Sequence, residues 1–190
     1  MSFRYLPCVL ALAVLTSACS SGDDVQVFGG DTDVVNGHIS LTDGRVTIKM
    51  PGAPNATVDQ NGQLAVDGHD VAVNDAQRTL LQHYNASAQH MREHAMEAGK
   101  AGMNTATKEL SAVAGKMSGA NDANAAVEAA KQKVEDASQT ILAATAKICD
   151  DMVEMKSAQD QLAVQLDAFK PYATALKDEN IARCRKDTKR

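Results

Sequence analysis

Tryptophan is absent from the 190-residue sequence, and only three tyrosines and three phenylalanines supply aromatic side chains. Proteins that hold single-stranded nucleic acid stack its bases on such side chains, so few stacking platforms are available here. Basic residues are scarce in one part of the chain, because residues 20–75 contain nine acidic residues against Arg45 and Lys49. An acidic surface repels the phosphate backbone, and no nucleic-acid partner is predicted.

Motifs of common enzymes are also missing. The sequence has no glycine-rich loop for phosphate, no G-x-S-x-G nucleophile turn and no C-x-x-C pair of the zinc-site type. We therefore expect no catalytic residue and no cofactor, and we expect a protein that is not an enzyme.

An export signal is predicted over residues 1–18. Arg4 precedes the apolar run 5–15, which is too short to cross a bilayer as a helix but has the length of a signal-peptide core. The small residues 16–18 complete a signal-peptidase site. We expect this segment to be removed during export to the cell envelope.

Cys19 follows directly, and the sequence Leu15-Thr16-Ser17-Ala18-Cys19 resembles the lipobox of bacterial lipoproteins, whose cysteine is acylated. Residues 19–24 then form a polar tether between the lipid and the domain. The alternative is ordinary cleavage after Ala18, which leaves Cys19 as a free thiol. We expect lipidation, and by analogy with lipoprotein sorting Ser20 favours the periplasmic face of the outer membrane.

Residues 25–73 alternate short apolar segments with turns. Asx-Gly dipeptides suit tight hairpins because glycine accepts positive φ and Asn or Asp tolerates it. Four are present: Asn36-Gly37, Asp43-Gly44, Asn61-Gly62 and Asp67-Gly68. The expected strands are 38–41, 45–50, 56–59, 63–66 and 70–73. Val46, Ile48 and Met50 share one side of their strand, as in an antiparallel sheet covered on one face.

From residue 74 to residue 184 the composition changes to good helix formers. Asn74 is placed to cap a first helix, with Gln77 in the capping-box position. One apolar stripe of that helix consists of Leu81, Tyr84, Ala88, Met91, Ala95 and Ala98. After a reversal at 118–122, a second stripe recurs every seven residues: Val127, Val134, Ile141, Ile148, Met155, Leu162 and Phe169. Between these residues lie the small side chains of Ala130, Ala137, Ala144 and Ala158, a series that Asp151 and Gln165 interrupt. One large and one small residue per heptad predict the seam of a closely packed antiparallel helix pair.

Pro171 either ends the second helix or starts a short third helix over residues 171–177. Residues 185–190 are expected to form a basic tail. The predicted fold class is α+β, with a small antiparallel β-hairpin region followed by a long antiparallel helical hairpin and a short C-terminal helix.

His90-x-x-Glu93-His94 matches the pattern of inverted zinc metalloproteases. Histidines four apart on a helix share a face and can bind one zinc ion beside a glutamate base, but the sequence offers no clear third ligand. A broader interpretation is metal binding by His83, His90, His94 and Glu97. A solvated flank beside the apolar stripe explains them equally simply, and we favour it. A zinc-dependent hydrolase or a metal-binding protein is the alternative function.

Cys149 and Cys184 form an isolated pair in a chain expected to enter an oxidising compartment. From Cys149 to residue 170 a helix climbs about 33 Å, and the remaining chain is long enough to return to its start. We predict a disulfide. Two free buried thiols and a redox-active pair are the alternatives.

The run 62–78 and the segment 149–155 (Cys-Asp-Asp-Met-Val-Glu-Met) resemble the YggN-like family of exported bacterial proteins, a domain of unknown function. The similarity spans about residues 38–184. It implies a periplasmic location and a β-then-α layout, and it supplies no activity. The sequence thus favours an envelope lipoprotein, membrane-bound through its lipid, that acts as a structural or partner-binding module. Its partner and its oligomeric state are left open.

Overall fold

The computed structural model describes residues 32–35, 37–116 and 123–189. The predicted signal peptide 1–18, the lipidation site Cys19, the tether 19–24 and the reversal 118–122 lie outside the described residues. So do the side chains of residues 106–127.

Six short strands form one antiparallel sheet whose spatial order follows the chain, β1-β2-β3-β4-β5-β6. They are β1 Thr32–Val35, β2 Ile39–Thr42, β3 Arg45–Ile48, β4 Ala56–Val58, β5 Leu64–Val66 and β6 His69–Asp70. All five predicted strands are present, although the last is only two residues long and begins one residue earlier than expected. Strand β1 was not among the expected strands and adds an edge beside β2.

The predicted Asx-Gly turns explain this meander. Asp43 and Gly44 have φ of 49° and 74°, and Asp67 and Gly68 have φ of 51° and 78°. Positive φ at both central residues matches the twist of two-residue hairpins. These pairs therefore connect β2 to β3 and β5 to β6 without longer loops.

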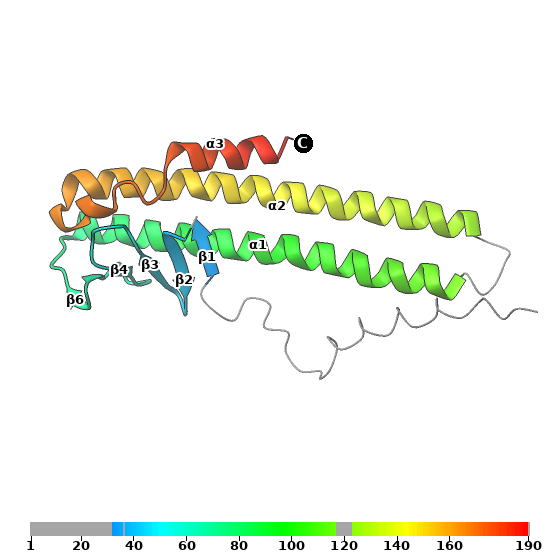
Figure 1. The fold of residues 1–190 in the computed structure, drawn as a ribbon, viewed down its shortest axis with the longest axis horizontal. Helices are drawn as coiled ribbons and strands as arrows, with labels where there is room; N and C mark the ends of the chain where they lie inside the picture. The colour runs from blue at the N-terminus through cyan, green and yellow to red at the C-terminus, as the bar shows by residue number, and fades with distance from the viewer. Residues whose placement is uncertain (1–31, 36, 117–122, 190) are drawn as a thin grey trace, which may run out of the picture.

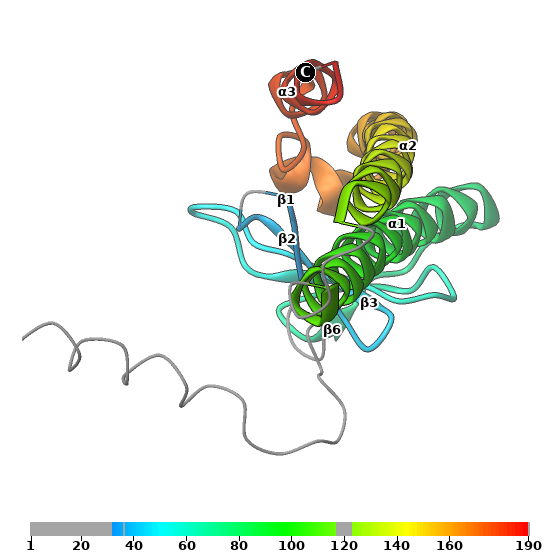
Figure 2. The ribbon, with the colours of Figure 1, turned by 90° about the vertical axis from the view of Figure 1, so that its right-hand side faces the viewer.

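One face of the sheet is apolar because successive side chains of a strand point to opposite faces. Val46 is fully buried between its cross-strand partners Leu41 and Val58. Ile48 is likewise buried, and Met50 packs against the same core, as predicted for their strand. This face packs against the helices, and Figure 2 shows the sheet on one side of them.

Two long helices follow, α1 Asp75–Lys116 and α2 Ala123–Gln165, with 42 and 43 residues. Each is about 63 Å long at 1.5 Å per residue, and they run side by side as a hairpin (Figure 1). The predicted capping box is present: the Gln77 N–H donates to Asn74 Oδ1 at 2.9 Å, and the Asn74 N–H donates to Gln77 Oε1 at 3.0 Å. The expected fold class is confirmed. No described helix combines the length and hydrophobicity needed to cross a membrane.

The C-terminal helix lies elsewhere than predicted. Pro171 is inside a 3₁₀ segment, η1 Asp167–Tyr172, and the short α-helix is α3 Asp178–Asp187. The prediction of a helix over 171–177 is therefore wrong, and the first half of the predicted basic tail 185–190 is helical.

The buried side chain of Gln159 explains this reversal of the chain. Its Nε2 donates to the carbonyl oxygens of Ala173 and Leu176, and its Oε1 accepts from the Leu176 N–H at 2.9 Å. These bonds satisfy backbone groups that a continued helix would have satisfied. The chain therefore leaves the 3₁₀ segment as a turn, and α3 begins only at residue 178.

Candidate functional site

Two histidines and one aspartate meet between the long helices. His90 and His94 project from α1, and Asp151 projects from α2; we call them the His90–Asp151–His94 cluster. His90 Nδ1 lies 3.8 Å from Asp151 Oδ1, and His94 Nε2 lies 3.7 Å from Asp151 Oδ2. The Asp151 residue is only 9% exposed, whereas the side chain of His90 is 54% exposed. The cluster is therefore a carboxylate inside the interface, reached by one exposed imidazole, that of His90, and one half-buried imidazole, that of His94.

The buried carboxyl group of Asp151 has few hydrogen-bond donors and positive charges around it. Its Oδ2 atom is buried and finds no hydrogen-bond donor within the described part of the chain. Burial raises the pKa of this carboxyl, the nearby His94 and His90 act to lower it, and the negative charges of Glu154 and Asp150 add to the rise. The raised pKa means that the folded protein binds a proton at Asp151 more readily than an exposed aspartate does.

The predicted metal ligands do not converge on one point. The two imidazoles approach different oxygens of Asp151, and Glu97 instead pairs with His94 Nδ1 at 3.5 Å and with Lys147 at 3.6 Å. His83 lies apart, in a groove beside Leu80 and Glu154. Among the residues that the structure describes, no group of three or more His, Cys, Asp or Glu side chains is arranged to hold a metal ion.

Glu93, the general base of the metalloprotease pattern, is exposed on α1. The match to that pattern follows from the i, i+4 spacing of the histidines and not from an assembled site. The zinc-dependent hydrolase accordingly receives no support from the geometry.

Sequence reasoning missed the role of Asp151, which it treated only as an interruption of the seam. The signal was present: a charged residue in an apolar heptad position needs a partner from the facing helix. His90 and His94 on the facing helix are the available partners. Pairing the two helices in register would have brought them together.

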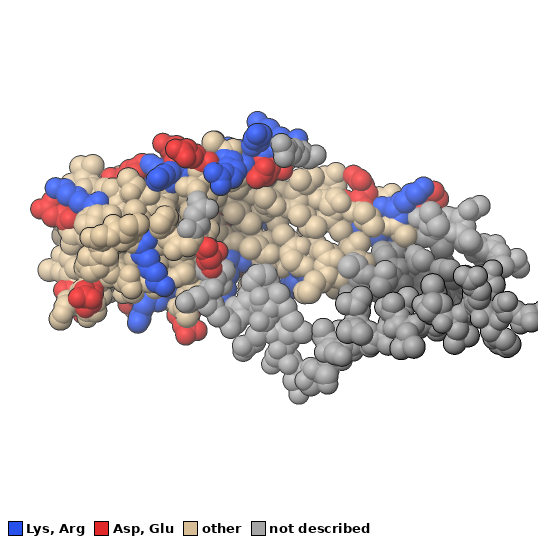
Figure 3. Space-filling model, in the orientation of Figure 1, with Lys and Arg blue, Asp and Glu red and all other residues tan. Residues whose placement is uncertain are grey.

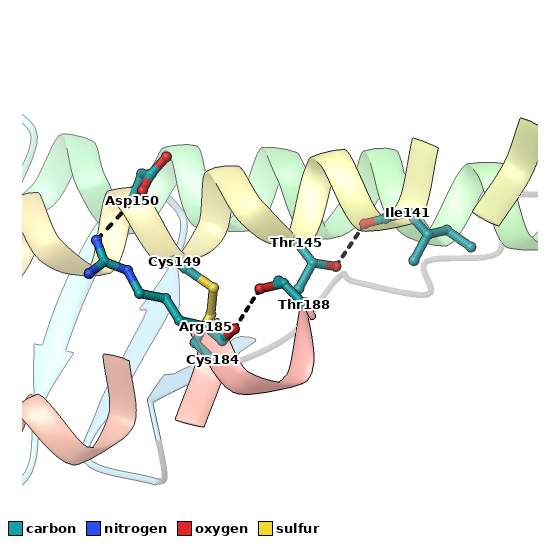
Figure 4. The surroundings of a disulfide bond; sticks show 7 residues. All are labelled: Ile141, Thr145, Cys149, Asp150, Cys184, Arg185 and Thr188. Atoms are coloured by element: carbon teal, nitrogen blue, oxygen red, sulfur yellow. Dashed lines mark hydrogen bonds and ion pairs between the residues drawn. A yellow bond between two sulfur atoms is a disulfide. The ribbon is translucent and has the colours of Figure 1, made fainter. Parts of the chain in front are cut away.

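The predicted disulfide between Cys149 and Cys184 is present and joins α2 to α3 (Figure 4). The two Cα atoms are 5.7 Å apart, across a sequence separation of 35 residues. Beside it Arg185 pairs with Asp150 at 3.9 Å. A disulfide is consistent with an extracytoplasmic location, because reducing compartments keep thiols free.

The third helix has little else to hold it. Ile181 is its only buried residue, and Figure 3 shows charged side chains gathered along it. A helix of ten residues with one apolar anchor is marginal by itself. The disulfide is therefore the main attachment of α3.

Two open grooves flank an exposed line on α2, formed by Val153, Ser157 and Gln161 and called here the α2 crest. The groove toward α3 measures about 570 Å³ and includes Ile181. The groove toward α1 measures about 510 Å³ and includes Leu80. Both contain all three crest residues, so the crest is the shared wall of a broad surface spanning three helices.

A family model matches residues 34–131, and its description is "Protein of unknown function (DUF2884)". The match covers more than half of the 190-residue chain. The chain belongs to the DUF2884 family. The predicted resemblance to a domain of unknown function is thereby confirmed. The DUF2884 match ends at residue 131, well before residue 184, and it leaves out Asp151, both disulfide cysteines and α3. No curated protein and no solved structure matches the chain.

Proposed function

We propose that this DUF2884 protein is a lipid-anchored protein of the bacterial cell envelope whose helical hairpin binds a protein partner and performs no catalysis. Acylated Cys19 holds it at the periplasmic face of the outer membrane. Within DUF2884 it belongs to the YggN-like group of exported proteins. The disulfide supports the oxidising compartment, and the sequence Leu15–Cys19 supports the anchor.

The observation that carries partner binding is the α2 crest with its two grooves. Val153 is 37% exposed at the crest, and Val164, farther along α2, is 82% exposed. The neighbouring residues Met155 and Leu162 are fully buried, so this part of α2 is rigidly supported. The groove walls combine apolar side chains such as Val153 and Ile181 with charged ones such as Lys156, and such a groove between helices suits an amphipathic segment of another protein.

In-cell photo-crosslinking tests this surface. A photoreactive residue at Ser157 should capture an envelope protein, and the additional substitution Val153→Asp should abolish that product because it places a charge in the apolar contact. A photoreactive residue at the exposed Gln139 on the same helix is the matched control. The same products from positions 157 and 139, or a product that survives Val153→Asp, would refute docking at the crest.

The anchor is tested separately by metabolic labelling with an alkynyl fatty acid. Wild-type protein should take up label and fractionate with membranes, because several acyl chains together anchor stably. Cys19→Ser should lose the label and leave the membrane fraction. Cys8→Ser, which changes a cysteine of the predicted signal peptide, is the control and should keep the label. Equal labelling of wild type and Cys19→Ser would show that the processing site is wrong.

A further inference from the structure

We infer that the His90–Asp151–His94 cluster is a latch between α1 and α2 that tightens in mild acid. The carboxylate belongs to one helix and both imidazoles belong to the other, at 3.7 and 3.8 Å. Every interaction within the cluster therefore crosses the interface of the hairpin. A change in its charge acts directly on how strongly the two helices hold together.

At neutral pH the cluster is unbalanced. Histidine is the side chain whose charge ordinarily changes between about pH 5 and 8, and without that charge His90 and His94 leave a negative Asp151 without a cation. The other charged groups around Asp151 on its own helix, Asp150 and Glu154, are negative as well. A buried charge without a partner costs free energy.

Two cations of the helices beside the cluster pair with other carboxylates. Lys147 of α2 pairs with Glu97 of α1, and Arg185 of α3 pairs with Asp150. Glu97 also lies 3.5 Å from the second ring nitrogen of His94. The imidazoles are therefore the groups placed to compensate Asp151.

Acidification removes the imbalance by adding positive charge on the facing helix. Protonated imidazoles form ion pairs with the Asp151 carboxylate across the interface, and a charge-assisted contact is stronger than a neutral one. Protonation of the histidines therefore strengthens the hairpin as the pH falls.

The first test compares melting temperatures of wild type and Asp151→Asn at pH 7.5 and 5.5. Asparagine keeps the shape and removes the charge, so Asp151→Asn should match or exceed wild type at pH 7.5 and fall behind it at pH 5.5. The difference between the two proteins should change by about 2–4 °C, the shift that a free-energy change near 1 kcal/mol produces in a chain of this size. Asp136→Asn, which changes an exposed aspartate elsewhere on α2, is the control and should show the same difference from wild type at both pH values.

A second comparison asks whether the histidines are responsible. In a His90→Gln/His94→Gln background the effect of Asp151→Asn should be the same at both pH values, whereas a His83→Gln background should retain the pH dependence. An equal wild-type to Asp151→Asn difference at pH 7.5 and 5.5 overturns the latch. A pH dependence that survives loss of both histidines overturns it too.

Wild-type protein alone gives a further readout. After correction for the intrinsic rate, amide hydrogen exchange over residues 88–97 and 148–155 should slow at pH 5.5 relative to pH 7.5. Exchange in β2 and β3 should not change, because the ion pairs of the cluster join α1 to α2. Unchanged protection in both helical segments would contradict the proposal without any substitution.

Discussion

The sheet covers one half of the helical hairpin, and the other half extends beyond it (Figure 1). Both halves follow the same heptad pattern, but they differ in how far its residues are buried. In the covered half Met155 and Leu162 are fully buried. In the extended half Val134 is 50% exposed and Met103 on the facing helix is 51% exposed. A seven-residue seam therefore sets which side chains face the partner helix, and a third layer decides how far they are buried.

The third layer consists of the sheet and the 3₁₀ segment. The ring of Phe169 lies edge-on to Tyr84 of α1, with centroids 5.7 Å apart, and also to Tyr172 at 5.8 Å. The Tyr172 hydroxyl donates to the Pro54 carbonyl at 2.8 Å, which ties this segment to the loop after β3. Local stability should therefore be high near the sheet and low toward the hairpin end.

The largest effect should come from Phe169→Ala. Removing a fully buried ring that contacts two others leaves a cavity, and such changes cost about 3–5 kcal/mol. Urea unfolding followed by circular dichroism measures the loss. Phe169→Leu retains much of the volume and should lose clearly less. A loss below 1 kcal/mol for Phe169→Ala would mean that the aromatic cluster does not hold the covered half together.

Opening the disulfide should have the next largest effect. Closing a loop of 35 residues stabilises the folded state by about 3–4 kcal/mol in the chain-entropy account, an upper value because unfolded chains retain structure. Cys149→Ala/Cys184→Ala should lower the melting temperature and release α3, while most helicity stays in α1 and α2. Mass spectrometry of unreduced, alkylated protein checks the premise. Two freely alkylated thiols in periplasmic material would remove the bond from the mature protein.

The sequence was informative wherever a local rule determined the structure. Neighbouring residues alone determine the paired positive φ at Asp43 and Gly44 and the capping box at Asn74. Chain length alone determines that the chain can return from Cys149 to Cys184. Heptad spacing likewise identified which side of α2 faces α1.

The sequence was uninformative where partners are distant in the chain. Gln159 ends the 3₁₀ region by donating hydrogen bonds to carbonyl groups 14 and 17 positions away. The periodicity of the sequence does not predict such bonds. Asp151 acquires a role only when α1 is docked in register. The candidate site and the position of α3 both depend on such long-range pairs, so they became clear only with the fold.

Asn85→Ala should have an intermediate effect that separates the two layers. The buried Asn85 Nδ2 donates to the carbonyl oxygens of Gly44 and Val58, both at 2.9 Å, and thereby ties α1 to the sheet. Leaving buried carbonyls unpaired costs about 1–3 kcal/mol. Hydrogen exchange should accelerate mainly in β2 to β4. Gln82→Ala removes an exposed contact to Asn61 and is the control; equal losses in both variants would show that the buried ties contribute nothing special.

The smallest effect is expected for Val134→Ala in the extended half, and its sign is informative. Val134 is half exposed, so truncation removes only part of the ~1.5–3 kcal/mol that a fully buried valine contributes. Alanine in turn favours the helix over valine by about 0.5 kcal/mol, because it loses no side-chain rotamer freedom. The two terms nearly cancel, and we expect a change within about 0.5 kcal/mol in the free energy of unfolding, as at other surface positions.

Ile148→Ala, at a half-buried seam position nearer the sheet, is the comparison and should lower the free energy of unfolding clearly more in the same urea titration. A loss above 1 kcal/mol for Val134→Ala would mean that another surface covers this residue in solution. Sedimentation over a range of protein concentrations would then show whether a second copy of the chain is that surface.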